Sequence, residues 1–269
     1  MVNFRRGAYT SVATMEQSYP ERETVRRQAF EPIWTEVIND VFADVAKYYD
    51  RANVFATLGL INPLRRRFIA TMQVRPHDKV LDVCAGTNII GIDLLRREPT
   101  LELHAIDRSQ PMQDVGGARA KALGLEIHSH IGDVHRLPFP DNHFDVVTLQ
   151  WATRHLRAAQ VVNEIHRVLK PGGRFYHCDM LRPANKLVER VYYLYLTAIV
   201  GVISWAFRSA PPALACRRYF VDAIRLFYTT DEFSQLLRGH GFSGVVGRSL
   251  LLGAVGYHRA VKPHDAPRG

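Results

Sequence analysis

The sequence predicts an α/β protein built on one mostly parallel β-sheet with helices on both faces. From Lys79 onward, short apolar segments alternate with longer segments whose apolar residues recur every three or four positions, an order typical of such a sheet. Residues 22–76 show the helical period alone. A chain of 269 residues with 47% hydrophobic content can bury one large core plus appendages. We therefore expect a single α/β domain preceded by an N-terminal helical cap.

The N-terminal extension and helical cap are expected to occupy residues 1–76. Within this segment Ile33, Val37, Val41 and Val45 follow one another at four-residue steps, as residues on one face of a helix do. The first residues carry arginines but no apolar run, so we expect no secretory signal.

The α/β domain is expected to span residues 77–262, with 263–269 as a C-terminal tail. Apolar runs predict strands at KVLDVC (79–84), LELHAID (101–107), LEIHSHIG (125–132), FDVVTLQW (144–151) and GRFYHCDM (173–180). The periodic segments between them predict helices at IIGIDLLRRE (89–98), PMQDVGGARAKALG (111–124) and AAQVVNEIHRVLK (158–170). After a helical insert at about 184–228, one more helix (229–242) and two closely joined strands (244–261) are expected to complete the sheet as a hairpin.

Composition narrows the partners and the compartment. The net charge of +9 and the pI near 9.7 favour an anionic partner, either nucleic acid or an anionic membrane surface. The three cysteines, Cys84, Cys178 and Cys216, have no CxxC spacing. This argues for a reducing compartment and against a disulfide or zinc framework.

The turn after the first strand, Cys84 to Asn88, is the candidate binding loop. In a doubly wound sheet, small residues at this turn let the backbone approach a ligand at the carboxyl ends of the strands. The G-x-G-x-x-G pattern that a dinucleotide requires is absent. Asp82, just before the turn, would repel a pyrophosphate but suits a ligand with ammonium and sulfonium groups.

Two more carboxylates follow the next strands. Asp107 ends the second strand, where it could accept hydrogen bonds from both ribose hydroxyls, and Asp133 follows the third, where it could meet an adenine amino group. Each alone could be a helix or turn cap. Together with Asp82, at the ends of consecutive strands, they indicate S-adenosylmethionine as the ligand.

Several segments resemble the ubiquinone/menaquinone biosynthesis C-methyltransferases, the UbiE family. The resemblance covers roughly residues 42–262 and is carried by VFADVAKYYDRAN (41–53), LDVCAGTNI (81–89), LPFPDNHFDVVT (137–148), RHLRAAQVVNEIHRVLKPGGRF (154–175) and YFVDAIRLFYTTDEFSQLLRGHGF (219–242). It implies a class I methyltransferase (Rossmann-like) sheet of seven strands, with the cap and a helical lid insert. It also implies transfer of a methyl group from S-adenosylmethionine to a ring carbon of a polyprenylated quinol.

The resemblance also implies the site. It assigns the cofactor to Asp82, Ala85, Gly86, Thr87, Asn88, Asp107, Asp133, Val134 and Gln150. Where the family has Gly-Gly-Thr-Gly, this chain has Ala85 to Asn88, and Asn tolerates a left-handed backbone almost as glycine does. The family's His and Trp after the YDxxN motif are Ile61 and Leu64 here.

The acceptor site is expected to involve Arg154 and His155, where the family carries Arg and Asn. Carbon methylation needs a phenolate-like ring and exclusion of water. Arg154 could stabilise the developing phenolate, and His155, with an ordinary pKa near ~6.5, could accept a proton between about pH 6 and 7. Alternatively, His155 is a half-exposed residue at the start of a helix. No metal is expected, since no third ligand accompanies the alternating pair His128 and His130.

The insert contains an uncharged stretch, Val191 to Phe207, between Arg190 and Arg208. A membrane crossing would separate the last two strands from their sheet, so we expect a lid helix that lies against lipid or covers the acceptor. A buried core helix is the alternative. The basic charge agrees with a cytoplasmic protein on the inner face of a membrane, or in the mitochondrial matrix of a eukaryote.

Three functions remain open. The favoured one is a membrane-peripheral, S-adenosylmethionine-dependent methyltransferase that acts on an isoprenoid quinol. The second is a related transfer to another quinone or to a lipid headgroup. The third is a non-catalytic, cofactor-binding subunit of a quinone-synthesis complex, and a homo-oligomer or such a complex is left open as a partner. Nucleic-acid methylation is disfavoured, because no NPPY or DPPY motif follows the fourth strand.

Overall fold

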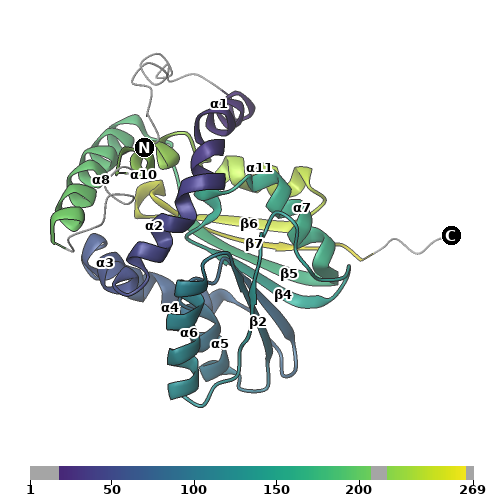
Figure 1. Cartoon of the computed structure of the whole chain (residues 1–269). Coiled ribbons are helices and arrows are strands. Elements are labelled where there is room, and N and C mark those ends of the chain that lie inside the picture. Colours follow the sequence, from purple (N-terminus) through teal and green to yellow (C-terminus); the bar gives the residue numbers. More distant parts are fainter. Residues whose placement is uncertain (1–17, 207–216, 265–269) are drawn as a thin grey trace.

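A seven-stranded sheet forms the centre of the molecule, with strand order β3-β2-β1-β4-β5-β7-β6 (Figure 1). The computed structural model describes residues 18–206 and 217–264. The strands are β1 (Lys79–Val83), β2 (Glu102–Asp107), β3 (His128–Ile131), β4 (Phe144–Gln150), β5 (Leu169–Met180), β6 (Ser243–Leu250) and β7 (Val255–Val261). β1 to β5 run parallel, and β7 is antiparallel to both β5 and β6. The predicted sheet and its closing hairpin are confirmed.

The parallel register brings several strand ends to one edge. Val83 of β1 pairs with Ile106 of β2 and Leu149 of β4, and Asp107 pairs with Ile131. The residues that follow these strands therefore emerge side by side. This edge is where an open α/β sheet binds its ligand.

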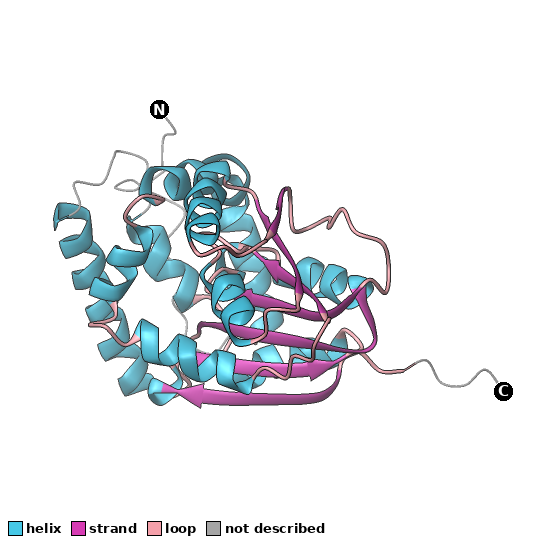
Figure 2. Ribbon diagram, turned by 90° about the horizontal axis from the view of Figure 1, so that it is seen from below, coloured by secondary structure: helices cyan, strands magenta, loops and turns pink. Residues whose placement is uncertain are grey.

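Helices cover both faces of the sheet, as Figure 2 shows. They are α5 (Ile89–Arg97), α6 (Gln110–Ala122), α7 (Ala158–Val168) and α11 (Thr230–Gly239), together with α4 (Ile61–Thr71) of the cap. One buried cluster joins Leu81 and Val147 to Ile165 of α7 and Phe233 of α11. Another joins their strand neighbours to α4 and α5. Successive strand residues point to opposite faces, so the continuous apolar runs in β1 and β4 fill both layers.

The cap and the insert pack together beyond this edge. The cap comprises α1 (Tyr19–Pro32), a π-helical turn (Ile33–Val37), α2 (Ile38–Val45), α3 (Tyr49–Ala56) and α4, and the insert contributes α8 (Lys186–Ala206) and α10 (Arg217–Arg225). Phe30, Trp34 and Val41 share a buried cluster with Tyr219 and Ala223 of α10. Figure 1 shows α1 to α3, α8 and α10 gathered at one end of the sheet. The predicted boundary at residue 76 therefore separates parts that are packed together.

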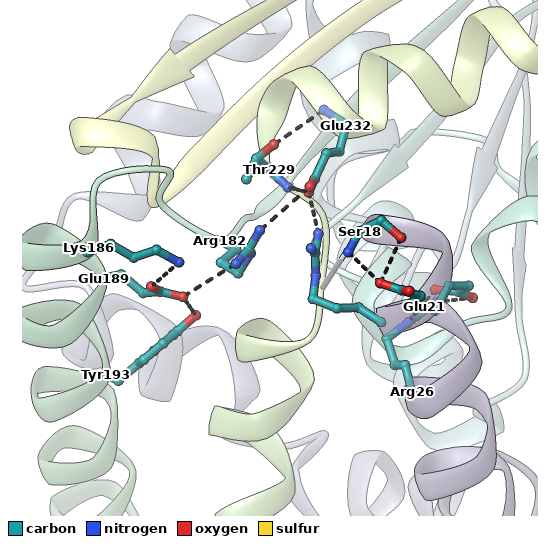
Figure 3. A network of polar contacts seen from close by, with 11 residues as sticks. Ser18, Glu21, Arg26, Arg182, Lys186, Glu189, Tyr193, Thr229 and Glu232 are labelled. Carbon is teal, nitrogen blue, oxygen red and sulfur yellow. Dashed lines mark hydrogen bonds and ion pairs between the residues drawn. The ribbon is translucent and has the colours of Figure 1, made fainter. Parts of the chain in front are cut away.

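Ion pairs connect the cap, the insert and α11, as Figure 3 shows. Glu232 caps the start of α11 by accepting a hydrogen bond from the Thr229 N–H at 2.8 Å. It also pairs with Arg22 of α1 at 2.6 Å and with Arg182 at 3.6 Å. Arg182 in turn lies 3.8 Å from Glu189 of α8. Glu232 thus ties α11 directly to α1 and, through Arg182, to α8.

The expected insert is helical, although Phe207 and Arg208 and the side chain of Trp205 lie outside the described residues. Among the described helices, none combines the length and the apolar character that a membrane crossing requires. Cys84 and Cys178 are free thiols, and Cys216 lies outside the described part.

Candidate active site

A cavity opens at the carboxyl edge of the parallel strands. Its wall is formed by the turn after β1, the ends of β2 and β4, the loop after β3, and the cap helices α2, α3 and α4. The predicted cofactor residues in this wall are Asp82, Ala85, Gly86, Thr87, Asp107, Asp133, Val134 and Gln150. The sequence therefore predicted one side of the cavity, and the cap supplies the other.

The turn after β1 has an unusual backbone. Cys84, Gly86 and Asn88 have positive φ angles of 55°, 53° and 56°, so the prediction that asparagine would tolerate this conformation is confirmed. The Asn88 side chain, however, is fully buried and accepts a hydrogen bond from Gln113 of α6 at 3.0 Å. Asn88 thus supports the turn from behind, outside the cavity wall.

Asp82 has a carboxyl group that is almost completely buried, with an exposed fraction of 2%. Its Oδ2 atom finds no hydrogen-bond partner among the residues that the structure describes. Burial, and then the negative charge of Asp107, raise the pKa of Asp82 to about 8. A buried acceptor of this kind is costly unless a ligand satisfies it.

Asp107 anchors the turn while facing the cavity. Its two oxygens accept hydrogen bonds from the backbone N–H groups of Gly86 and Ser109, each at 2.8 Å. Burial raises the pKa of Asp107, and these N–H groups oppose that rise. Each carboxylate oxygen can accept a second hydrogen bond, so Asp107 keeps capacity for a ligand.

Asp133 is more exposed and forms two charge-assisted contacts. Arg108 donates to it at 2.7 Å, and the ring Nδ1 of His135 lies 2.6 Å away. Burial acts to raise the pKa of Asp133, but the hydrogen bonds from His135 and the charge of Arg108 hold it below its usual value. Asp133 is therefore ionised, and the adjacent Val134 provides an apolar surface, since it is 4% exposed.

Gln150 and Trp151 end β4 at the cavity. The Nε2 atom of Gln150 is buried, and it lies beside the thiol of Cys178, which is only a weak acceptor. Trp151 has a positive φ of 57°, and its backbone N–H donates to the Cys178 carbonyl at 2.8 Å. This strained backbone conformation changes the direction of the chain between β4 and residues 153–155.

Asp50 of α3 was missed as a site residue, although it lies in the YDxxN motif used for the resemblance. Its carboxylate accepts a hydrogen bond from the Thr87 hydroxyl at 2.9 Å and pairs with Arg119 of α6 at 2.7 Å. Asp50 therefore fastens the cap to the turn after β1. The motif was the available signal, but its partners lie 37 and 69 residues away in sequence.

Arg154 lies next to the cavity without lining it. Its guanidinium pairs with the buried Asp179 at 2.5 Å and donates to the Trp151 carbonyl at 2.7 Å. Burial lowers the pKa of Arg154, but Asp179 and the nearby Tyr49 raise it overall. Arg154, which was predicted to contact the phenolate, instead contacts Asp179 and the Trp151 carbonyl. These contacts orient Trp151.

His155 does line the cavity. It ends the 3₁₀ helix η2 (Thr153–His155) and is 4% exposed, so the alternative of a half-exposed residue at the start of a helix is wrong. Burial, and then the charges of Arg154 and Arg26, lower the pKa of His155 well below its usual value. This lowered pKa argues against the expected proton uptake between pH 6 and 7, because burial and the neighbouring guanidinium groups disfavour the charged imidazolium.

Arg26 of α1, also missed, holds η2 in place. Its guanidinium is fully buried and donates to the carbonyl oxygens of Arg154 at 3.1 Å and Leu156 at 2.9 Å. Trp34, Asn39 and Phe42 of the cap add to the cavity wall. The apolar periodicity of this segment predicted a helix but carried no information on which surface the helix would cover.

The predicted pair His128 and His130 lies on the edge strand β3, away from the cavity. His130 contacts the His104 ring at 3.1 Å between nitrogen atoms. Within residues 18–206 and 217–264, no group of three or more histidine, cysteine or acidic side chains is arranged to hold a metal ion.

The strand order and the cavity at the carboxyl edge together define a class I methyltransferase fold. Solved structures share it. The chain is similar to a SAM dependent methyltransferase from Aquifex aeolicus (TM-score 0.52, 17% identity, covering 74% of this chain and 89% of that one). It is also similar to geranyl diphosphate C-methyltransferase from Streptomyces coelicolor (TM-score 0.55, 13% identity, covering 76% and 79%).

The chain belongs to the ubiE/COQ5 methyltransferase family, which residues 31–262 match. It is therefore a methyltransferase, and the predicted resemblance is confirmed. It is 30% identical to the demethylmenaquinone methyltransferase of Symbiobacterium thermophilum, covering 85% of this chain and 93% of that protein. It is 31% identical to the mitochondrial 2-methoxy-6-polyprenyl-1,4-benzoquinol methylase of Caenorhabditis elegans, covering 84% and 80%.

Proposed function

We propose that this protein transfers a methyl group from S-adenosylmethionine to a ring carbon of an isoprenoid quinol. The observation that carries the proposal is the composition of the cavity. The buried Oδ2 atom of Asp82 lacks a partner within the described chain, and the same cavity has an aromatic and aliphatic wall from the cap. A charged cofactor and a flat apolar acceptor need these two kinds of surface in one site.

The residues at the strand edge fit the cofactor. Asp82 offers an unsatisfied oxygen to a cationic group, and Asp107 has remaining acceptor capacity for ribose hydroxyls. Asp133 and Val134 would hold the adenine, and Gln150 can donate from its buried amide. When bound, S-adenosylmethionine supplies an electrophilic methyl group on its sulfonium.

Replacing Asp107 tests the cofactor site. We expect Asp107→Ala to weaken S-adenosylmethionine binding by at least about 2 kcal/mol in calorimetry, because hydrogen bonds to a charged group are lost. Asp114→Ala is the matched control, since Asp114 lies exposed on the neighbouring α6 and contacts Gln110. Circular dichroism checks that the variant keeps its overall fold. Unchanged affinity in Asp107→Ala would overturn the assignment.

The cap fits a planar acceptor. Trp34, Phe42 and Tyr49 line the cavity, and aromatic side chains stack favourably on flat rings. Two relatives are named for demethylmenaquinone and for a polyprenylated benzoquinol as acceptors. These names and the aromatic wall support a quinol here.

The reaction asks the chain to position the acceptor and exclude water. We assign Arg154 a positioning role, because its ion pair with Asp179 and its bond to the Trp151 carbonyl hold the end of β4. Of residues 153–155, which follow β4, His155 is the one whose side chain lines the cavity.

The acceptor is tested with purified protein and S-adenosylmethionine. Parallel reactions contain one acceptor each: reduced demethylmenaquinone, a demethylated polyprenyl benzoquinol or phosphatidylethanolamine. Mass spectrometry measures the masses of the products. We expect one added methyl group on a quinol. Methylation of the phospholipid would favour the headgroup alternative, and cofactor binding without any product would favour a non-catalytic subunit.

A membrane-embedded acceptor also requires access to a lipid surface. We propose that the protein binds peripherally to the cytoplasmic or matrix face of a membrane. Helix α8 exposes Leu187, Val191 and Leu194 along one face, with exposed fractions of 71%, 59% and 70%. Tyr195 joins this helix to α3 through a hydrogen bond to the Ala56 carbonyl, so the apolar face lies beside the cap that lines the cavity.

A further inference from the structure

Three side chains from three parts of the chain form a hydrogen-bonded row that ends at the cavity. Trp34 of the cap lies with its indole Nε1 2.9 Å from the Tyr219 hydroxyl of α10. The same hydroxyl lies 2.7 Å from Nδ1 of His155. All three residues are buried, with exposed fractions of 4% each.

The chemistry of the three groups sets the direction of these bonds. An indole N–H can only donate, so Trp34 donates to the Tyr219 oxygen. Between a phenol and a neutral imidazole, the phenol is the better donor and the unprotonated ring nitrogen the better acceptor, so Tyr219 donates to Nδ1 of His155. Nδ1 then carries no hydrogen.

A neutral imidazole has one N–H group, which must therefore be at Nε2 of His155. This nitrogen is buried, and it has no hydrogen-bond partner in the described residues 18–206 and 217–264. His155 itself lines the cavity. A buried N–H without an acceptor is energetically unfavourable, so a ligand atom that accepts this hydrogen bond would be stabilising.

We propose that His155 donates a hydrogen bond from Nε2 to a ring oxygen of the acceptor, and that Tyr219 and Trp34 are positioning residues that hold it in this tautomer. The inference rests on the proposed function and specifies how the acceptor is held. It assigns His155 as a donor, where the sequence had suggested a proton acceptor.

The donor role suits carbon methylation. The acceptor reacts as its monoanion after its hydroxyl proton has passed to water, and the oxygen's electron pair raises the nucleophilicity of the ring carbon. The carbon–methyl bond forms as the carbon–sulfur bond breaks, with the sulfur retaining that electron pair. The ring carbon then loses its proton to water, which restores an aromatic anion, and the oxygen takes a proton from water. Relative to the neutral quinol, both the anion and the transition state for methyl transfer carry negative charge on this oxygen, and a hydrogen bond from Nε2 stabilises both of them.

Two substitutions separate a donor from a base. His155→Asn keeps an N–H donor but cannot accept a proton at neutral pH, whereas His155→Leu removes both properties. We expect His155→Asn to retain the methylation rate within about tenfold with an unchanged profile between pH 6 and 8, and His155→Leu to lose about 100-fold or more. Calorimetry with S-adenosylmethionine checks that both variants keep the cofactor site. Equal losses in the two variants would overturn the donor assignment.

A spectroscopic measurement tests the tautomer without any turnover. In protein with ¹⁵N-labelled histidine, NMR ring-nitrogen shifts distinguish a protonated from an unprotonated nitrogen. We expect His155 to show a protonated Nε2 and an unprotonated Nδ1, and Tyr219→Phe to reduce that preference. His155→Asn identifies the resonance by its disappearance. A protonated Nδ1 in the unsubstituted protein would overturn the inference, while a correct tautomer with no quinol methylation would overturn the proposed function and leave only the tautomer of His155 assigned.

Discussion

Asp82 is a residue at which stability and binding oppose each other. Its carboxyl group is buried beside Asp107, and these two surroundings raise its pKa to about 8. The ordinary value for an aspartate in an unfolded chain is about 3.9. Between these two values the folded protein holds a proton that the unfolded chain releases, so the ligand-free protein loses stability as pH rises through this window.

We therefore predict that Asp82→Asn stabilises the ligand-free protein near pH 8 and weakens its binding of S-adenosylmethionine. The gain in the free energy of unfolding should be larger at pH 8 than at pH 5, approaching about 1.4 kcal/mol per pH unit between them, because asparagine has no carboxyl group to ionise. Urea unfolding at pH 5 and at pH 8 measures the free energy of unfolding of both proteins. An equal gain at pH 5 and pH 8 would show that the Asp82 pKa is not raised.

Single residues also show where sequence reasoning stops. The small residues of the turn after β1 and the acidic residues at the strand ends could be predicted, because strand order brings them to one edge. The direction of the Asn88 side chain could not be predicted, since it depends on a hydrogen bond from Gln113 of α6. Likewise, the low pKa of His155 depends on burial and on Arg26 of α1, 129 residues before it.

Among the elements, α3 decides how the cap meets the α/β domain. Asp50 accepts a hydrogen bond from Thr87 and pairs with Arg119, so one carboxylate ties α3 to the turn after β1 and to α6. Thr87 is in turn part of the cavity wall. Closure of the cap and the shape of the cofactor loop are therefore linked.

We predict that Asp50→Ala loosens the cap by about 1.5 to 3 kcal/mol, the range for losing a hydrogen bond to a charged group, and weakens cofactor binding by no more than that amount. Hydrogen exchange should rise in α3 and in the turn after β1, while the strands of the sheet stay protected. Asp40→Ala is the control, because Asp40 is exposed on α2. Unchanged exchange in α3 would show that the cap is held by its apolar contacts alone.

At the scale of the whole molecule, the alternation of apolar runs and periodic segments predicted the parallel sheet because both signals are local in sequence. The final strand order is set by long-range packing. β6 precedes β7 in sequence, yet β7 lies between β5 and β6 in the sheet. The cap's place over the cavity is equally long-range, since Phe30 and Trp34 find their partners in α10.

The basic charge and the apolar face of α8 lead to a prediction for the molecule as a whole. With a net charge of +9, the protein should float with phosphatidylglycerol-containing liposomes at low salt, and added salt should release it because the charges are screened. Changing Leu187, Val191 and Leu194 together to serine removes three exposed apolar side chains from α8 and leaves its charges intact.

This triple variant should bind the same liposomes at least tenfold more weakly, because each buried apolar side chain contributes about 1.5 kcal/mol or more on leaving water. Leu123→Ser, at the far end of α6 and 43% exposed in the native protein, is the control and should bind normally. If charge alone attracted the protein, the triple variant would bind as well as the control. If both variants and the native protein stayed unbound at low salt, the acceptor would have to reach the cavity without the enzyme docking on a membrane.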